Sequence, residues 1–504
     1  MSFIWNFPLF TVLLSLFTGP LCMMLSAKAA RNYTIAYESV LIGMTGSVLA
    51  YTLKTGTSFT YTMGEFPAPW GNEIRAGSLE ALIALLFSVV LLCSVTAGYH
   101  FIRKDMDESK INLYFTLLNL LTAALMAIVW TNDVFTGYVF LEILTLTSCG
   151  ILIVREIGRT TLAAVRYMIL NLMGSGLFLM GIVLLYDVSG HLLMVPIRQS
   201  LREISSDPAA IPAITMAVGI MTIGIAIKSG LFPFYFWMPD TYGWATPTSG
   251  AVLSALVSKG YIFLLFKIYY RAVGIDVMQK TPILKILFVL GICGIIAGSF
   301  NAIRASNINR MIAFSSAAQI GYIYMGIGIG TTAGFAAALF QILAHALTKS
   351  LLFLTAPYLA EVSSDSLKFH ALQGSAHRDP AAGMMFTTGA LSMIGIPVFA
   401  GFAGKLMFGQ AVVLGGVHWR ILTVLATLGI SSVLNAFYFI RTLIRIYYDP
   451  DEQAKSSANS RSAFDLSRAG FGFAGFVLVV LNVFLGLFSW VVSDVIYRGL
   501  GMFL

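Results

Sequence analysis

Six ionisable residues lie inside long apolar runs of this sequence, where water is scarce. They are Glu142, Lys228, Lys259, His345, Lys349 and Lys405. A charged side chain in hydrocarbon is costly unless it finds a counter-charge, becomes neutral or reaches the interface. Residues of this kind inside spans are typical of proton or ion pathways. The alternative is that each lysine only marks the end of a span, with its ammonium at the surface.

Glu142 is the clearest acid within a span, in the segment FLEILTLTS. Thr145 follows about one helical turn later and could offer a hydroxyl group. The charge of a buried carboxyl depends on whether a lysine lies within about 4–6 Å, so Glu142 could switch with the position of its partner. The alternative is a static structural ion pair.

Two of the lysines adjoin breaks in apolar runs. Ser229-Gly230 and Pro233 follow Lys228, whereas Pro397, Gly401 and Gly404 precede Lys405. Interrupted backbone at membrane depth is tolerated only where protein buries it or where it lines a cavity. Two broken helices five spans apart are typical of inverted-repeat transporters.

The run that contains His345 has a polar stripe. Gln341, His345 and Lys349 are spaced i, i+4 and i+8, so they share one helical face. An imidazole one turn from a lysine is a plausible step of a proton relay. The alternative is that His345 is a hydrogen-bonded core residue.

The composition indicates what must position these residues. Of the 504 residues, 58% are hydrophobic and 11% are charged, and the mean hydropathy is +0.84. This composition predicts an all-α integral membrane protein in contact with the lipid bilayer. About fourteen transmembrane helices are expected, at residues 5–25, 36–53, 79–101, 112–131, 135–154, 161–186, 212–235, 248–271, 282–303, 308–329, 333–358, 383–410, 420–446 and 470–495.

The spans group into four regions. Residues 1–110 contain spans 1–3, and 111–275 and 276–447 are two inverted five-helix repeats, each with a broken helix. Residues 448–504 contain a hydrophilic loop and the last span. If the N-terminus is outside, sixteen basic residues fall in inner loops and nine in outer loops. This bias predicts that both termini lie outside the cell (inner or plasma) membrane.

Several classes of function are disfavoured. The net charge of +8 comes from short loops between spans, so it indicates no nucleic-acid binding. The four cysteines form no CxxC pair, and no nucleotide-binding glycine pattern occurs. We therefore expect no metal site, no cofactor and no catalytic residue, so that the chain by itself is not an enzyme. In a redox-driven oxidoreductase it would be a non-catalytic subunit.

Five segments match a known pattern. They are FLEILTLTS, KSGLFPFYFWMPDTYGWATPTSGAVLSALVSKG, NRMIAFSSAAQIGY, HALTKSLLFL and GFAGKLMFG. With them the chain resembles the antiporter-like subunits of respiratory complex I, membrane-bound hydrogenases and Mrp-type multisubunit cation/proton antiporters. The resemblance covers spans 3 to 13.

The resemblance implies a role for each buried ionisable residue. Glu142 would pair with Lys228, and Lys259 would lie near the centre of the channel. His345 and Lys349 would continue the relay to Lys405 at its end. In the family such residues form a hydrated polar chain that passes protons along the membrane plane.

Departures from the pattern indicate a subfamily. Many complex I members have a histidine shortly before the lysine that Lys259 matches, but this chain reads VLSALVSKG there. In this respect it is closest to the Mrp D type of antiporter-like protein. The segment IRAGSLEAL also has Gly77 where relatives usually have aspartate.

The sequence therefore predicts a proton-translocating membrane subunit of a multisubunit complex, with exchange for Na+ left open. An ion-pumping subunit of a redox-driven complex, such as a membrane-bound hydrogenase or an NADH/quinone oxidoreductase, is the main alternative. A stand-alone solute carrier and a structural subunit without transport are further alternatives. The intramembrane lysines disfavour the former, and the complete set of six relay residues disfavours the latter.

Overall fold

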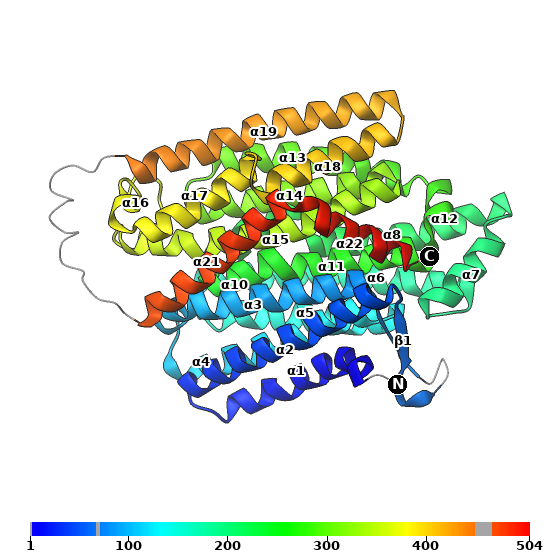
Figure 1. Cartoon of the computed structure of the whole chain (residues 1–504), viewed down its shortest axis with the longest axis horizontal. Helices are drawn as coiled ribbons and strands as arrows, with labels where there is room; N and C mark the ends of the chain where they lie inside the picture. The colour runs from blue at the N-terminus through cyan, green and yellow to red at the C-terminus, as the bar shows by residue number, and fades with distance from the viewer. Residues whose placement is uncertain (1–2, 67–70, 449–465, 504) are drawn as a thin grey trace.

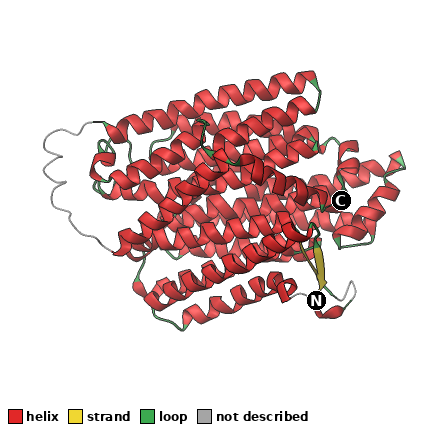
Figure 2. Cartoon of the chain, in the orientation of Figure 1, coloured by secondary structure: helices red, strands yellow, loops and turns green. Residues whose placement is uncertain are grey.

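The computed structural model of the chain describes residues 3–66, 71–448 and 466–503, which fold into one large bundle of helices (Figures 1 and 2). The first half comprises α1 (Phe7–Met23), α2 (Ala27–Thr55), α3 (Ser78–Asp105), α4 (Glu108–Trp130), α5 (Val134–Ile153), α6 (Gly158–Ser189), α7 (Met194–Ile204), α8 (Ile211–Ser229), α9 (Met238–Trp244), α10 (Pro247–Val252), α11 (Ser258–Lys267) and α12 (Ile275–Lys280). The second half comprises α13 (Ile283–Arg304), α14 (Ile308–Ile329), α15 (Thr332–Glu361), α16 (Ser375–Arg378), α17 (Pro380–Ile394), α18 (Ala400–Leu414), α19 (His418–Tyr447), α21 (Leu466–Leu487) and α22 (Ser489–Gly501).

A single small hairpin departs from the all-α expectation within the described residues. Strands β1 (Phe59–Thr62) and β2 (Glu73–Ala76) pair antiparallel between α2 and α3. Figure 1 shows the hairpin at the same end of the bundle as both chain termini. Trp5 stacks on Phe59, and the guanidinium of Arg75 donates a hydrogen bond to the carbonyl of Met502, so the hairpin ties the two termini together.

Twelve helical stretches in the described part of the chain are long and apolar enough to cross a membrane. Each of the fourteen expected ranges falls on a helix or on consecutive helices. Two of the fourteen expected ranges are not among these twelve stretches. One falls on α2, which is too polar, and the other is divided into α17 and α18, which are too short at 15 residues each. A total of fourteen spans therefore stays a prediction. The expected loop at 449–465 lies outside the described residues.

The faces of the outer helices are apolar, as an embedding lipid requires. Leu422, Val433 and Phe437 of α19 and Ile169 and Met173 of α6 are all exposed. In contrast, α15 is buried along the whole of Gly334–Ala360, and it lies in the middle of the bundle in Figure 1. Exposed apolar faces around a buried central helix confirm an integral membrane protein.

Both expected broken helices are present. Helix α8 ends at Gly230 with a φ of 76°, and α17 ends at Gly395 with a φ of 92°. Both values lie in the left-handed region, which glycine adopts without a steric penalty. The chain then continues as α9 and α18, respectively, which leaves unpaired backbone groups beside each break.

The eighth expected span is distorted around its lysine. One π-helical turn at Leu253–Val257 precedes α11, and a second at Ile268–Val273 follows it. A π turn shifts hydrogen bonding to i→i+5 and frees carbonyl groups locally, and such turns are frequent at functional sites.

Candidate proton-transfer site

The first pair of charged groups joins α5 and α8. Lys228 is completely buried in the last turn of α8, and its Nζ lies 3.8 Å from Oε1 of Glu142. This contact is an ion pair without a hydrogen bond, because Oε1 has no hydrogen-bond partner. The carbonyl groups at the C-terminus of α8 also favour a cation there. The ammonium is therefore held near Glu142 without being fixed to it.

Hydroxyl groups continue from this pair. Lys228 Nζ donates to Oγ1 of Thr145 at 2.8 Å, so Thr145 serves the lysine rather than the glutamate. Oγ1 of Thr145 lies 3.1 Å from the hydroxyl of Tyr261, which lies 3.4 Å from that of Tyr167. The ring of Tyr261 also faces the ammonium, at 5.4 Å. This chain of hydroxyls leads from Lys228 to α11, the helix that carries Lys259.

Lys259 binds its own helix. Its ammonium donates to the carbonyl of Ser254, in the π turn, and to Oγ of Ser258 at 3.0 Å. Because no acid faces Lys259 among these partners, neutral oxygens alone stabilise its proton.

The polar residues of α15 face α14. Gln341 donates to Oε1 of Gln319, whereas Lys349 donates to Oγ of Ser315 and, at 2.9 Å, to the carbonyl of Ile312. His345 lies between them along the helix, and neither of its ring nitrogens has a partner. An imidazole that is 1% exposed and unbonded is free to accept or donate a proton when water reaches it.

Lys405 closes the second break. It belongs to α18, but its Nζ reaches back to the carbonyl of Ile394, the last residue of α17, at 2.6 Å. It also donates to Oγ of Ser432 on α19, at 2.8 Å. The two breaks thus differ. Lys228 lies before its break, in the last turn of α8, whereas Lys405 lies after its break and binds the carbonyl end of α17.

A second group of polar side chains lies on α14 and α19, near Lys349 and Lys405. Helix α14, which carries the Ser315 that Lys349 binds, packs against α19, which carries Tyr438. Tyr438 donates to Oδ1 of Asn435 at 2.7 Å. Asn435 is one helical turn from Ser432, which accepts from Lys405. The two lysines of the second half thus bind hydroxyl groups of α14 and α19, respectively.

The lysine-bearing helices form a row. Helix α8 packs against α11, the π turn before α11 packs against α15, and α15 packs against α18. Lys228, Lys259, Lys349 and Lys405 thus follow one another across the bundle rather than along a helix axis. Each of the four ammonium groups binds its own oxygen partners.

Sequence reasoning missed several polar residues of this row. The tyrosines Tyr167, Tyr261 and Tyr438 gave no signal, because aromatic residues are ordinary in spans. Outside the row, Lys267 did give a signal, as a further lysine in the run of Lys259. It is fully buried and donates to the carbonyls of Val129 and Thr131 at the end of α4.

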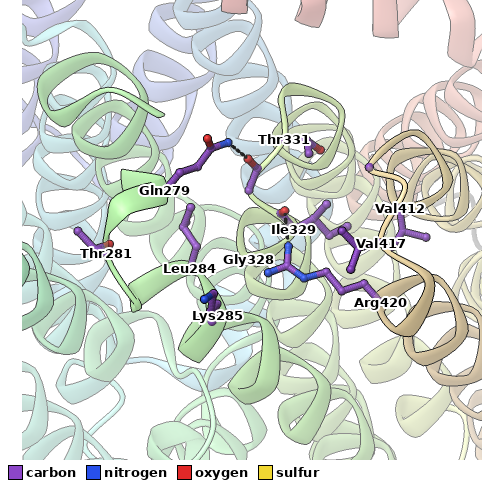
Figure 3. Close-up of a pocket in the computed structure, with 12 residues that line it drawn as sticks. Gln279, Thr281, Leu284, Lys285, Gly328, Ile329, Thr331, Val412, Val417 and Arg420 are labelled. Atoms are coloured by element: carbon purple, nitrogen blue, oxygen red, sulfur yellow. Dashed lines mark hydrogen bonds between the residues drawn. The ribbon is translucent and has the colours of Figure 1, made fainter. Parts of the chain in front are cut away.

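Two cavities lie at opposite ends of the bundle. One, of about 390 Å³, is lined by charged residues that include Lys104, Asp105 and Arg155. The other, of about 200 Å³, is shown in Figure 3, where Gln279 and Arg420 donate to the carbonyls that end α14. Buried apolar side chains, among them Phe408 and Ala411, lie between the second cavity and Lys405.

Known proteins resemble this chain in sequence and in fold. A family profile described as "NADH:quinone oxidoreductase/Mrp antiporter, TM" matches residues 131–431. The N subunit of the NADH-quinone oxidoreductase of Desulforudis audaxviator is 31% identical over 88% of this chain and 86% of its own length. The D subunit of the Na(+)/H(+) antiporter of Bacillus subtilis is 24% identical over 96% of this chain and 94% of its own.

Solved structures agree with this likeness. A chain of the Mrp complex from Dietzia sp. DQ12-45-1b superposes with a TM-score of 0.86, at 20% identity, over 99% of this chain and 97% of its own length. A chain of a membrane-bound sulfane sulfur reductase, an archaeal respiratory membrane complex, gives 0.84 at 21% identity over 100% and 97%. At these identities the structures show a common fold. With the sequence match over residues 131–431, they place the chain in the NADH:quinone oxidoreductase/Mrp antiporter family of transmembrane proteins.

Proposed function

We propose that the chain translocates protons as an antiporter-like membrane subunit of a multisubunit complex, and that the row from Glu142 to Lys405 is its relay. The observation that carries this proposal is the contact between Lys228 and Glu142. A fully buried ammonium 3.8 Å from a carboxylate that does not hydrogen-bond to it is a pair that can separate. Separation would remove the attraction that keeps the proton on Lys228.

The proton would then move through side-chain oxygens and water. From Lys228 it would pass by Thr145 and Tyr261 towards Lys259, and from there to His345 and Lys349. The polar groups of α14 and α19 would complete the path to Lys405. The cavity beside Lys104 and Arg155 would supply water from one face, and an opening past Phe408 would release protons at the other.

The partners and the membrane follow from the same proposal. The relatives are named as subunits of complexes, so this chain would assemble with other membrane subunits in a cell membrane. Both termini lie at one end of the bundle. From the distribution of basic residues, we propose that this end is the outer one. The missing histidine favours the Mrp D type, whereas identity is higher to an N subunit of NADH-quinone oxidoreductase, so a redox-driven complex stays the second candidate. In either complex this chain would not itself be an enzyme.

The division into repeats belongs to this proposal as well. Residues 111–275 and 276–447 each contain one broken helix and buried lysines that bind hydroxyl groups of neighbouring helices. A duplicated unit with a break near the middle of the membrane is the arrangement by which transporters alternate access. Residues 1–110 and 448–504 would flank the two units.

Replacing lysine by arginine tests the relay. Arginine keeps the positive charge but does not release its proton at physiological pH, so Lys259→Arg should abolish proton transport in vesicles that contain the assembled complex. Lys267→Arg is the matched control, because Lys267 is equally buried on the same helix and only caps carbonyl groups of α4. Wild-type transport by Lys259→Arg in an assembled complex would show that Lys259 is a static residue.

A further inference from the structure

A further ionisable group, Glu38, lies buried outside the relay. Glu38 is on α2 and is completely inaccessible to solvent. Its Oε1 accepts a hydrogen bond from Oγ1 of Thr122 on α4 at 3.2 Å, and its Oε2 has no partner. No basic side chain of the described residues pairs with it. A lone carboxylate is not stable at such a position, so Glu38 requires either a bound proton or a bound cation.

Asn119 supplies a second unsatisfied oxygen, about one helical turn along the interface between α2 and α4. Its Nδ2 donates to Oγ1 of Thr34 on α2 at 3.2 Å and to Sγ of Cys22 on α1, but its Oδ1 is buried without a partner. Asn119 and Thr122 are one turn apart on α4, as are Thr34 and Glu38 on α2. The Asn119–Thr34 and Thr122–Glu38 contacts therefore lie one helical turn apart along the same interface, and together they form a polar ladder between α2 and α4.

The unsatisfied atoms of this ladder are all acceptors. Both are oxygens with free lone pairs, so a positive charge would satisfy them, whereas an anion or a hydrogen-bond acceptor would not. Small hard cations bind to oxygen ligands of this kind, with carboxylate, amide and hydroxyl oxygens together. A proton satisfies the same carboxyl group in the absence of the metal ion.

We propose that Glu38 and Asn119 form a second cation site, at which Na+ and a proton compete for one carboxyl group. Binding of Na+ would release the proton of Glu38, and protonation would release Na+. The site does not depend on the proposed relay; only its use in transport rests on the proposed function. It lies between α1, α2 and α4, and Figure 1 shows α1 and α2 at the edge of the bundle opposite α19.

Further polar groups line the same interface along α1. Ser15 of α1 contacts the hydroxyl of Tyr37, and Thr11 of α1 accepts from the indole of Trp130. Cys22 lies at the opposite end of this column, 3.8 Å from Thr34. Such side chains offer a line of oxygens by which an ion and water could reach the carboxyl group from either end.

Few other titratable groups face the site. The titratable neighbours are Tyr37, which lies on α2 next to Glu38, and Cys22, which lies on α1. On α3, which also packs against α2, the buried Glu80 is already paired with Arg75. Proton release on addition of Na+ can therefore be assigned to Glu38 by a single substitution.

The test measures protons released when NaCl is added to the purified complex, with choline chloride at equal ionic strength as the reference. The wild type should release one proton for each Glu38 as its carboxylic-acid infrared band disappears, and Glu38→Gln should show neither change. Asn119→Leu should weaken apparent Na+ affinity about tenfold, and Asn119→Asp, which adds a carboxylate, should strengthen it. Asn119→Leu keeps the number and branching of the side-chain heavy atoms and leaves Glu38 in place, so it keeps the test meaningful if Glu38→Gln does not assemble.

Two results would overturn the proposal. One is Na+-dependent proton release that persists unchanged in assembled Glu38→Gln, and the other is a carboxylic-acid band of Glu38 that Na+ never removes. Glu142→Gln separates this proposal from the relay, because it should stop proton transport while Na+-dependent release at Glu38 continues. Loss of release in that variant, with Glu38 intact, would likewise contradict an independent site.

Discussion

The pair formed by Glu142 and Lys228 allows a quantitative prediction. At 3.8 Å and an effective dielectric constant of about 20, the two charges attract each other by about 4 kcal/mol. Glu142→Gln preserves the size of the side chain and removes this attraction. Since about 1.4 kcal/mol corresponds to a factor of ten, the protonated form of Lys228 should become disfavoured by about 10³ relative to wild type.

This change should stop the relay at its first step, because a lysine that does not take up a proton cannot pass one on. Glu142→Asp is the graded control. Its carboxylate retreats by about one carbon–carbon bond, or about 1.5 Å, so it should lose about 1 kcal/mol and retain part of the activity. The expected order of proton transport is wild type, then Asp, then Gln.

The assay is dye-monitored acidification of membrane vesicles that contain the complex, driven by its own energy source. Assembly is verified by co-purification of the partner subunits, and the rate is divided by the amount of this chain. An assembled Glu142→Gln complex that transports protons at the wild-type rate would refute the reasoning. Equal losses in the Asp and Gln variants would show that distance, and hence Coulombic attraction, is not the controlling quantity.

Three further predictions concern the bridge, the far end of the relay and the packing. Tyr261→Phe deletes one hydroxyl of the chain that leaves Lys228 and should slow proton transport by about tenfold or more, with thermal stability close to that of wild type. Lys405→Ala should abolish transport in an assembled complex, and unchanged transport there would place the end of the relay elsewhere. Gly328→Ala would press a methyl group against the backbone nitrogen of Phe288 and should destabilise the protein by about 1–3 kcal/mol in thermal unfolding. Gly219→Ala, with nothing within 4 Å, is its control and should leave the unfolding temperature unchanged or slightly raised.

The sequence by itself determined the class of protein and the approximate helix positions. Long apolar runs have few alternatives in a membrane, because every backbone group must be satisfied within a helix. Glycine and proline marked both breaks for the same reason, since they are the residues that interrupt helical hydrogen bonding. The ionisable residues of the row were found because charge inside an apolar run is rare enough to be noticed.

Only the tertiary structure decided which groups meet. Thr145 was expected to serve Glu142 but its oxygen accepts from Lys228, because α8 brings the ammonium there. Tyrosine, serine and asparagine bridges come from helices far apart in the chain, and no local pattern encodes such contacts. Glu38 was inside an expected span and was still overlooked. Only the packing of α2 against α4 shows that Glu38 is buried with one hydrogen bond, from Thr122, and that its second carboxyl oxygen has no partner.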